Sequence, residues 1–312
     1  MSAGASKEVA LFGASGTIGR ATAAALIEAG HNVTCVMRKP FTTAPPPLAK
    51  ARYHYAEITG THCDLEALFQ NHSFDAVISC IASRSGEPDD AWLVDYAANL
   101  KILSAAKALD IKQFILLSAI CVQKPMLEFQ HAKLAFESAL IRSGIAYSIV
   151  RPTAFFKSLS GQIDRVRRGK PFLVFGNGKL TSCKPISDSD LARYIADCLH
   201  DPARRGAILP IGGPGPAITP LEQAHMLFDL TGRKPHFRTI PVGAMDALIA
   251  ALNIAGKLSK RAAAKAEYAR IGRYYATESM LVMNPATGEY DSTATPETGQ
   301  QTLQEHYYKA IS

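Results

Sequence analysis

The chain has 312 residues, of which 47% are apolar and 20% are charged. This composition allows a globular protein to bury a core and excludes a disordered or fibrous chain. Lysine and arginine number 34 against 27 aspartates and glutamates, so the formal net charge is +7. The surplus favours an anionic partner: cofactor phosphates, an acidic substrate, nucleic acid or an anionic membrane surface. The length suits two domains, or one large α/β domain with an appendage.

The cysteines and the chain start indicate where the protein resides. The six cysteines form no C-x-x-C pair and have no histidine at zinc spacing, so no metal site is predicted. They are Cys35, Cys63, Cys80, Cys121, Cys183 and Cys198, interpreted as buried thiols in a reducing compartment. The N-terminus passes directly into a strand-like run, so no signal or transit peptide is expected. The apolar stretch from Val242 to Gly256 is shorter than the ~20 residues of a membrane span. A soluble, cytoplasmic protein is expected.

The first half of the chain alternates short apolar runs with amphipathic helical segments, which predicts parallel strands joined by crossover helices. Strands are expected at Glu8–Phe12, Asn32–Met37, Arg52–Glu57, Ala76–Ile81, Gln113–Leu117 and Tyr147–Val150. One helix follows the first strand and ends at Gly30, and another runs from about Met126 to Ser143. The predicted fold is α/β, a Rossmann-type doubly wound parallel sheet with a smaller C-terminal substrate-binding region.

A glycine-rich segment joins the first strand to the first helix, with Gly13, Gly16 and Gly19 at intervals of three residues. Gly13 allows a tight turn, Gly16 lets the backbone approach a pyrophosphate, and Gly19 permits close helix–strand packing. The helix N-terminus adds N–H groups for the phosphates. The predicted cofactor contacts are Gly13, Ala14, Ser15, Gly16, Thr17, Ile18 and Gly19. The spacing resembles that of the extended and atypical short-chain dehydrogenase/reductase group; a glycine turn without a ligand is the alternative.

The residues after the second strand distinguish NADP from NAD. An acidic residue there would hold the ribose 2′-hydroxyl of NAD, whereas arginine accommodates a 2′-phosphate. Arg38 and Lys39 occupy this position, so NADPH is the predicted cofactor; a solvated basic turn is the alternative. Glu57 and Ile58 resemble the acidic–aliphatic pair with which the group reads adenine, although Glu57 also suits a strand end at the surface.

The helix over residues 126–143 carries Phe129 and Lys133 where carbonyl-reducing members of the group carry Tyr-x-x-x-Lys. The tyrosine protonates the oxygen formed by hydride addition, and a phenyl ring cannot. An activated carbon–carbon double bond needs no such proton. Lys133 would then orient the nicotinamide ribose and could donate a proton, directly or through water. Ser118 fits a polar position beside the nicotinamide, or a strand-end turn. From the residues alone, an alkene reductase and a non-catalytic NADPH binder are equal alternatives.

After Pro152 apolar runs and helical segments no longer alternate regularly. Glycine and proline recur in residues 169–178 and 209–220, which is typical of turns and loops. The chain is therefore expected to leave the sheet, return and leave it again. We predict an NADP-binding Rossmann domain over residues 1–212, with an excursion near 168–183. A smaller substrate-binding or lid region is predicted over residues 213–312.

Several segments closely resemble the divinyl chlorophyllide a 8-vinyl-reductase family of the NADPH-dependent type, in which the Phe-x-x-x-Lys variant is itself a feature. The segments are SCIASRSG (79–86), KPMLEFQHAKLAFE (124–137), RPTAFFKSLSGQ (151–162), KPISDSDLARYIADCL (184–199), LPIGGPGPAITPLEQAHMLF (209–228) and ESMLVMNPATGEYDSTATPETGQQTL (278–303). The resemblance implies NADPH-dependent reduction of the 8-vinyl group of 3,8-divinyl chlorophyllide a, or of its protochlorophyllide precursor, to an ethyl group in (bacterio)chlorophyll biosynthesis. An NmrA-like NADP(H) sensor and an isoflavone-reductase-like enzyme are the competing interpretations.

The resemblance also implies roles for individual residues. The implied catalytic residues are Lys133 and Ser118. Further cofactor contacts are implied at Ala82, Ser83, Lys133, Pro152, Thr153, Ala154 and Phe155. Contacts with the Mg-bearing pigment are implied at Phe129, Phe155, Phe156 and Lys157. For Phe155 and Phe156, a place in the core is the alternative.

Basic residues are concentrated near the C-terminus. The segment from Lys257 to Arg273 contains six of them and one acidic residue, Glu267. Such a helix could attract the propionate of the pigment or lie on an anionic membrane surface; a solvated helix face is the alternative. A peripheral contact with the photosynthetic membrane is therefore expected as one alternative. Nucleic acid is not expected as a partner, because no recognition motif accompanies the charge.

Overall fold

The computed structural model describes residues 5–40, 46–60, 65–70 and 72–312. The chain forms two compact units. The first comprises Met1–Val122, Glu128–Pro152 and Asp188–Leu209, and the second comprises Gln123–Leu127, Thr153–Ser187 and Pro210–Ser312. This partition assigns all of Thr153–Ser187 to the second unit, a longer segment than the excursion expected near 168–183. The division into domains at residue 212 stays a prediction.

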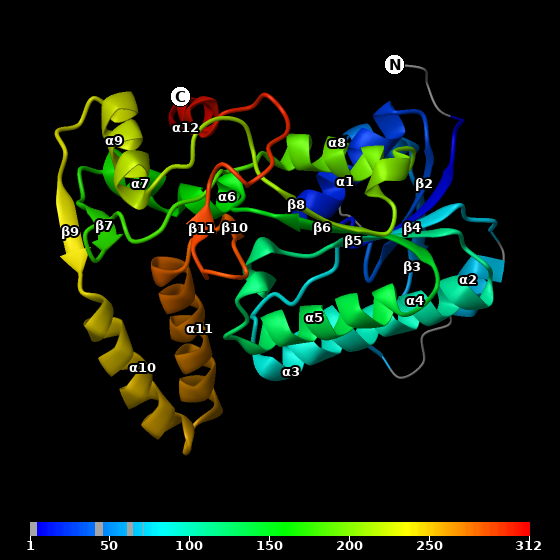
Figure 1. Cartoon of the computed structure of the whole chain (residues 1–312), viewed down its shortest axis with the longest axis horizontal. Helices are drawn as coiled ribbons and strands as arrows, with labels where there is room; N and C mark the ends of the chain where they lie inside the picture. The colour runs from blue at the N-terminus through cyan, green and yellow to red at the C-terminus, as the bar shows by residue number, and fades with distance from the viewer. Residues whose placement is uncertain (1–4, 41–45, 61–64, 71) are drawn as a thin grey trace. The chain divides into compact units, whose positions relative to one another are not determined.

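The first unit is built on a seven-stranded sheet with the order β3-β2-β1-β4-β5-β6-β8 (Figure 1). Strands β1 to β6 pair in parallel, and the chain changes sides between β1 and β4, as in a doubly wound Rossmann fold. The strands are β1 Glu8–Phe12, β2 Asn32–Met37, β3 Arg52–Tyr55, β4 Ala76–Ser79, β5 Gln113–Leu117, β6 Ala146–Pro152 and β8 Ala207–Ile211. The predicted fold class is confirmed. All six predicted strands are present, but β3 and β4 end two residues early, β6 is longer, and β8 was not predicted.

Helices cover both faces of this sheet. On one face α1 (Thr17–Glu28) and α8 (Asp188–Asp197) lie side by side, and on the other face lie α4 (Asn99–Ala108) and α5 (Glu128–Ile141) (Figure 1). With both faces covered, strands such as β1 and β4 are buried along almost their whole length, which explains their continuous apolar sequences. The short helix α2 spans Leu65–Gln70.

The predicted helix over residues 126–143 is confirmed as α5. It is two residues shorter than expected at each end. Its apolar stripe packs on the sheet, where Phe136 and Leu140 are fully buried and the Phe136 ring lies 5.7 Å from that of Phe114. This packing anchors the helix that carries Lys133.

Three helical segments follow one another without a break after β4. Helix α3 (Pro88–Ala91) passes into the π-helical segment η2 (Trp92–Ala98), which passes into α4. A π-helical turn holds one more residue between hydrogen-bonded groups than an α-helical turn, and such turns occur frequently at functional sites. The π-helical segment faces α5.

The second unit combines small sheets and helices around its own core. Strand β7 (Phe172–Phe175) pairs in parallel with β9 (Phe237–Ile240), and β10 (Val282–Met283) pairs with β11 (Tyr290–Asp291) in antiparallel. Its helices are α6 Phe156–Leu159, α7 Ile163–Arg167, α9 Pro220–Thr231, α10 Val242–Gly256, α11 Lys260–Thr277 and α12 Leu303–Ile311. Capping boxes at Thr219 and Thr302 begin α9 and α12. No helix in the described ranges is both long and apolar enough to cross a membrane.

Candidate active site

The loop between β1 and α1 has a shape that only glycine permits at two positions. Gly13 has a φ of +87°, and a Cβ placed on it would lie 2.7 Å from the backbone carbonyl of Cys80. A Cβ on Gly19 would lie 2.1 Å from the Gly13 carbonyl oxygen, and the N–H of Gly16 donates to that same oxygen at 2.9 Å. Gly13 is therefore required by the turn and Gly19 by the close packing of α1 against the loop.

The start of α1 suits an anionic ligand. Gly16 is the N-cap of the helix and provides no capping side chain, and the first turn contains no acidic residue. A Cβ on Gly16 would already lie 3.3 Å from the Gly13 carbonyl oxygen, so the bare backbone leaves space that a side chain would fill. Of the intervening residues, Ala14 and Ile18 are buried, Ser15 is exposed and Thr17 is half-buried. The loop therefore fits the pyrophosphate of a dinucleotide.

The predicted ribose and adenine contacts lie at the same edge of the sheet as this loop. Arg38 and Lys39 follow β2, and Glu57 and Ile58 follow β3. Strand β2 pairs with β1 and strand β3 pairs with β2, both in parallel. Arg38 and Lys39 are exposed and form no ion pair with any described residue, whereas Glu57 accepts a hydrogen bond from the Thr59 hydroxyl and Ile58 is buried. Carboxyl ends of neighbouring strands are where such sheets bind nucleotides.

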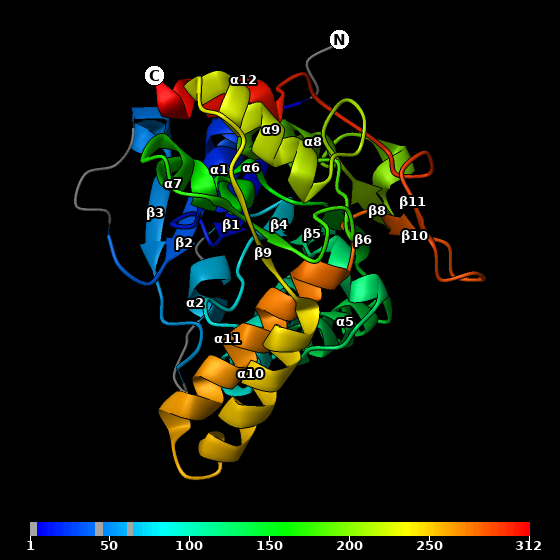
Figure 2. The same cartoon turned by 90° about the vertical axis from the view of Figure 1, so that its left-hand side faces the viewer.

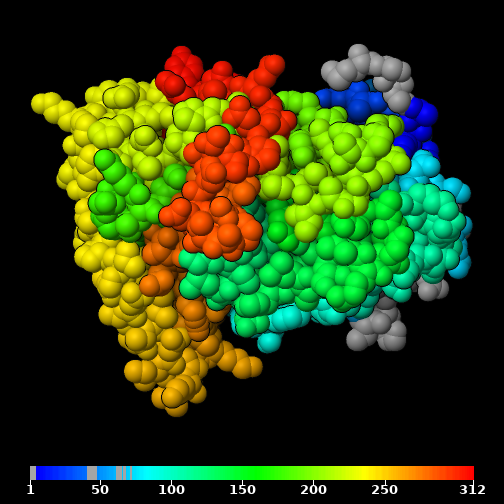
Figure 3. Space-filling model, in the orientation of Figure 1, coloured from blue at the N-terminus to red at the C-terminus, as the bar shows by residue number. Residues whose placement is uncertain are grey.

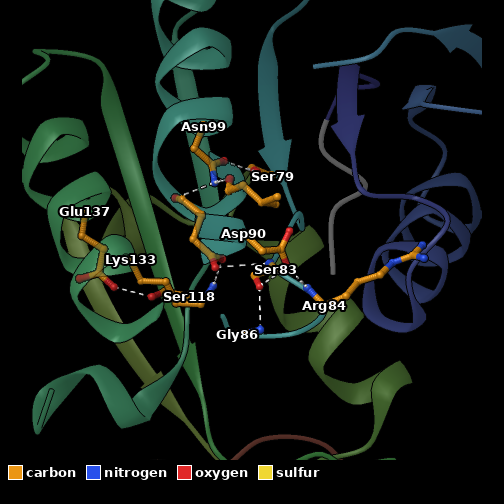
Figure 4. A network of polar contacts seen from close by, with 11 residues as sticks. Ser79, Ser83, Arg84, Gly86, Asp90, Asn99, Ser118, Lys133 and Glu137 are labelled. Atoms are coloured by element: carbon orange, nitrogen blue, oxygen red, sulfur yellow. Dashed lines mark hydrogen bonds and ion pairs between the residues drawn. The ribbon is translucent and has the colours of Figure 1, made fainter. Parts of the chain in front are cut away.

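The segment after β4 folds around one carboxylate. Oδ2 of Asp90 accepts hydrogen bonds from the hydroxyls of Ser83 and Ser85, at 2.5 and 3.0 Å, and from the N–H groups of Arg84 and Ser85 (Figure 4). Burial alone would raise the pKa of Asp90, but these hydrogen bonds outweigh it and lower the pKa. The Ser83 hydroxyl also accepts from the N–H of Gly86 at 2.8 Å. Ser83, a predicted cofactor contact, is thus fixed in place, while its neighbour Ala82 is exposed.

Lys133 forms an ion pair with a carboxylate that the sequence did not single out. Its Nζ lies 2.8 Å from Oδ1 of Asp95, and the side chains of Lys133 and Asp95 are 12% and 1% exposed. The other carboxylate oxygen of Asp95 accepts from the N–H of Ser83 at 3.3 Å. Asp95 lies in the π-helical segment η2 and therefore links the Lys133 ammonium to the segment that follows β4.

Two further polar residues hold η2 in place. The amide nitrogen of Asn99 donates to the backbone carbonyl of Asp95 at 3.1 Å, and its amide oxygen accepts from the Ser79 hydroxyl at 2.6 Å. Both Asn99 and Ser79 are buried. The turn that carries Asp95 is therefore fixed to the end of β4.

Ser118 belongs to a different buried network. Its hydroxyl donates to the carboxylate of Glu137, which lies one helical turn beyond Lys133 on α5 (Figure 4). The guanidinium of Arg151 on β6 binds both oxygens of that carboxylate. The Ser118 hydroxyl is thus already engaged with an anion inside the first unit. Its assignment as a catalytic residue stays a prediction.

Phe129 lies in the first turn of α5, one helical turn before Lys133, and its side chain is half-buried. The ring therefore occupies the position at which the tyrosine of carbonyl reductases would stand. Pro152, the last predicted contact in the first unit, is buried at the end of β6.

The remaining predicted residues, Thr153 to Lys157, belong to the second unit. Thr153 is buried; its N–H donates to the Ile211 carbonyl at 2.9 Å and its hydroxyl donates to the Lys184 carbonyl. Ala154 and Phe155 are half-buried and Lys157 is exposed. Phe156 is 4% exposed and packs in the apolar core of this unit. The predicted pigment contact of Phe156 is therefore corrected, because its ring is a core residue.

The described cysteines form no disulfide bond with one another. Burial raises the pKa values of Cys35 and Cys183 to about 12, so these thiols are unreactive at neutral pH. Cys63 lies outside the described residues.

Sequence reasoning missed Asp95 and Asp90. The spacing of Asp95 and Asn99, four residues apart on one helical stretch, was the available signal. The pairing of Asp95 with Lys133 joins two segments 38 residues apart, which neither periodicity nor a short motif reveals.

Comparison with known proteins agrees with this geometry. An NAD(P)H-binding family matches residues 13–202. The structure resembles NADPH-dependent quinone oxidoreductase QOR2 of Escherichia coli with a TM-score of 0.69 and 17% identity, covering 97% of this chain and 100% of that chain. It resembles epimerase Mth375 of Methanothermobacter thermautotrophicus with a TM-score of 0.71 and 15% identity, covering 97% of this chain and 91% of that chain. The chain is thus an NAD(P)H-binding protein of the Rossmann type, and its solved neighbours share the fold.

Sequence relatives identify the family more narrowly. The chloroplastic divinyl chlorophyllide a 8-vinyl-reductases of Zea mays and Arabidopsis thaliana are 46% and 45% identical to this chain. Each alignment covers 97% of this chain, with 79% of the Zea mays protein and 76% of the Arabidopsis protein. The chain belongs to the divinyl chlorophyllide a 8-vinyl-reductase family.

Proposed function

We propose that this protein reduces the 8-vinyl group of 3,8-divinyl chlorophyllide a to an ethyl group with NADPH. The observation that carries the proposal is the site on α5, where a phenylalanine replaces the proton-donating phenol and Lys133 is retained and ion-paired with Asp95. Family membership supports the same conclusion, because the relatives bear that enzyme's name over nearly the whole of this chain. Protochlorophyllide is the alternative pigment form.

Saturating a vinyl group takes up one hydride and one proton, and NADPH, when bound, supplies the hydride. The glycine loop would hold the pyrophosphate, and Arg38 with Lys39 would bind the 2′-phosphate, since both are exposed and have no ion-pair partner among the described residues. Glu57 and Ile58 would contact the adenine end. The predicted preference for NADPH over NADH follows from this basic pair.

The α5 side chains then determine which acceptor can react. A carbonyl acceptor needs a proton on its oxygen as hydride arrives, and Phe129 has no proton to give. A vinyl group conjugated to a macrocycle can delocalise the developing negative charge, so protonation at carbon can follow. Lys133 is the candidate for orienting the nicotinamide ribose and for supplying this proton, directly or through water.

Asp95 is the residue that positions Lys133. A buried carboxylate 2.8 Å from Nζ limits the directions in which the ammonium can point, and catalytic groups misplaced by about 1 Å can lose roughly a hundredfold in rate. The N–H of Ser83 and the Asn99 amide fix Asp95 in turn. We therefore assign Asp95 a positioning role.

The test is to incubate the purified protein with NADPH and divinyl chlorophyllide a and to follow the pigment's Soret band. A blue shift, with loss of the vinyl group by mass spectrometry, is the expected result. Lys133→Met should abolish the shift, whereas Lys107→Met, at an exposed lysine on α4, should not change it. If NADPH binds and the pigment stays unchanged, the protein is a cofactor sensor and the proposed reaction is wrong.

The pigment contacts at Phe129, Phe155 and Lys157, and the peripheral position at a photosynthetic membrane, remain predictions. The curated relatives are chloroplastic, which places those proteins in a compartment that contains such membranes.

A further inference from the structure

Helices α10 and α11 form a hairpin that leaves apolar side chains exposed. The two helices run antiparallel and lie side by side (Figure 2). Arg270 of α11 donates to the Asn253 side chain of α10 at 3.1 Å, and Arg273 pairs with Asp246. At the connection, a Cβ on Gly256 would lie 3.1 Å from the Cα of Ala263, so the backbones meet closely there.

Apart from Asp246 and Asn253, helix α10 consists of apolar residues and glycine, yet none of its residues is buried. Asp246 is the only charged residue among its 15, and α11 covers one side of it. The exposed large apolar side chains here are Leu248, Ile254 and, at the connection, Leu258, which are 54%, 70% and 95% exposed. A helix that is hydrophobic all round is normally buried, and large exposed apolar patches mark interaction surfaces.

The same end of the hairpin is strongly basic. Residues 257–265 contain no acidic residue, and their four cations are exposed and form no ion pair within the described part of the chain; these cations are Lys257, Lys260, Arg261 and Lys265. Figure 3 shows this end of the hairpin, in orange and yellow, with no other part of the second unit over it. The acidic residues of the hairpin, Asp246 and Glu267, pair with Arg273 and Arg270, away from the tip.

We propose that the tip of the α10–α11 hairpin inserts into the headgroup region of an anionic phospholipid membrane. Exposed Ile254 and Leu258 would enter the apolar boundary while the surrounding cations bind lipid phosphates. At 15 residues and about 1.5 Å per residue, α10 is about 22 Å long, shorter than the ~30 Å hydrocarbon core. The hairpin therefore lies at the interface and does not span the membrane. A second copy of the chain would bring an equally positive tip, which disfavours pairing of two tips.

Flotation of the full-length protein with lipid vesicles tests this proposal without NADPH or pigment, so its outcome is independent of the reductase assignment. The protein should float with phosphatidylcholine vesicles that contain phosphatidylglycerol and not with phosphatidylcholine alone. Lys260→Glu with Arg261→Glu should weaken binding roughly tenfold or more. Arg168→Glu with Lys170→Glu, at two exposed residues elsewhere in the same unit, makes the same charge change and should not affect binding. Ile254→Ser with Leu258→Ser should reduce binding while the charge is unchanged.

A fluorescent probe tests insertion directly. The chain has one tryptophan, Trp92, so Leu258→Trp in a Trp92→Phe background reports on the tip alone. Its emission should shift to the blue with anionic vesicles. Absence of flotation, equal losses in the tip and control variants, or a tip-dependent dimer in sedimentation would each overturn the proposal. So would tip variants that lose activity on detergent-dispersed pigment but bind vesicles normally.

Discussion

The ammonium of Lys133 and the carboxylate of Asp95 form a buried ion pair across 2.8 Å. Removing one partner from such a pair leaves an uncompensated charge, which costs about 3–5 kcal/mol. We therefore expect Lys133→Met and Asp95→Leu to lower the free energy of unfolding by that order. The double variant should lose less than the sum of the two, because it leaves neither charge unpaired.

Urea denaturation of the four proteins measures this coupling. Lys107→Met, on the exposed face of α4, is the control and should stay within about 0.5 kcal/mol of the parent protein. Strictly additive losses would show that the two charges do not interact in solution, and the positioning role of Asp95 would be lost with them.

Arg38 should decide between the two dinucleotides. A hydrogen bond to a charged group contributes about 1.5–3 kcal/mol, so Arg38→Ala should raise the KM for NADPH roughly ten- to a hundredfold. The KM for NADH should change little, because NADH lacks the 2′-phosphate. Steady-state kinetics with both cofactors provides the comparison, with Lys50→Ala as an exposed control on the 3₁₀ segment η1 (Pro46–Lys50), which lies between β2 and β3. Equal effects on both cofactors would remove Arg38 from the phosphate site.

Phe129→Tyr should not accelerate the reaction. The substitution restores a phenol one helical turn before Lys133, but a phenol is useful where an oxygen must be protonated. We expect an unchanged or lower kcat on the divinyl pigment. Single-turnover absorbance measurements under saturating NADPH would separate this step from binding. A gain in rate would contradict the proposed alkene mechanism.

The sequence predicted the sheet well because its signals are local. Six apolar runs gave six strands, and the three glycines located the loop whose backbone contacts exclude a Cβ at Gly13 and Gly19. The strand order then brought Arg38 and Glu57 to the edge beside that loop, so their proximity followed from topology.

The polar networks could not be predicted in the same way. Asp95 meets Lys133 from the π-helical segment η2, and no periodicity in the sequence indicated that change of helical type. Phe156 and Phe155 are adjacent and chemically identical, yet Phe156 is in the core and Phe155 is half-buried. Which ring is buried depends on packing with segments more than a hundred residues away, such as α12.

The stability of the first unit should fall in mild acid because of two histidines. His31 and His200 stack with ring centroids 5.0 Å apart, and their Nε2 atoms are 3.3 Å apart. The N–H of Lys7 donates to Nδ1 of His31 at 3.2 Å, so Nδ1 is an acceptor and the neutral ring carries its hydrogen on Nε2, which donates to His200. A second proton on His31 would break the contact with Lys7.

The direction of the pH effect follows from the pKa values of the pair. Burial, then the charges of His200 and Lys7, lowers the pKa of His31; burial, then the charges of Lys7 and Arg205, lowers the pKa of His200 against an opposing contribution from Asp197. Between these lowered values and the ordinary 6.5, the unfolded chain binds more protons than the folded one. The free energy of unfolding should therefore decrease as the pH falls below about 6.5.

Thermal or urea unfolding across about pH 5 to 8 measures this dependence. His200→Phe preserves a ring against His31 and removes one titrating group, so its stability should decline less steeply in the acid range than that of the parent. An unchanged urea m-value would show that both proteins unfold to a similar extent. If parent and variant lose stability in parallel as the pH falls, the His200 imidazole does not contribute to the acid sensitivity, because it is the only titrating group removed between them.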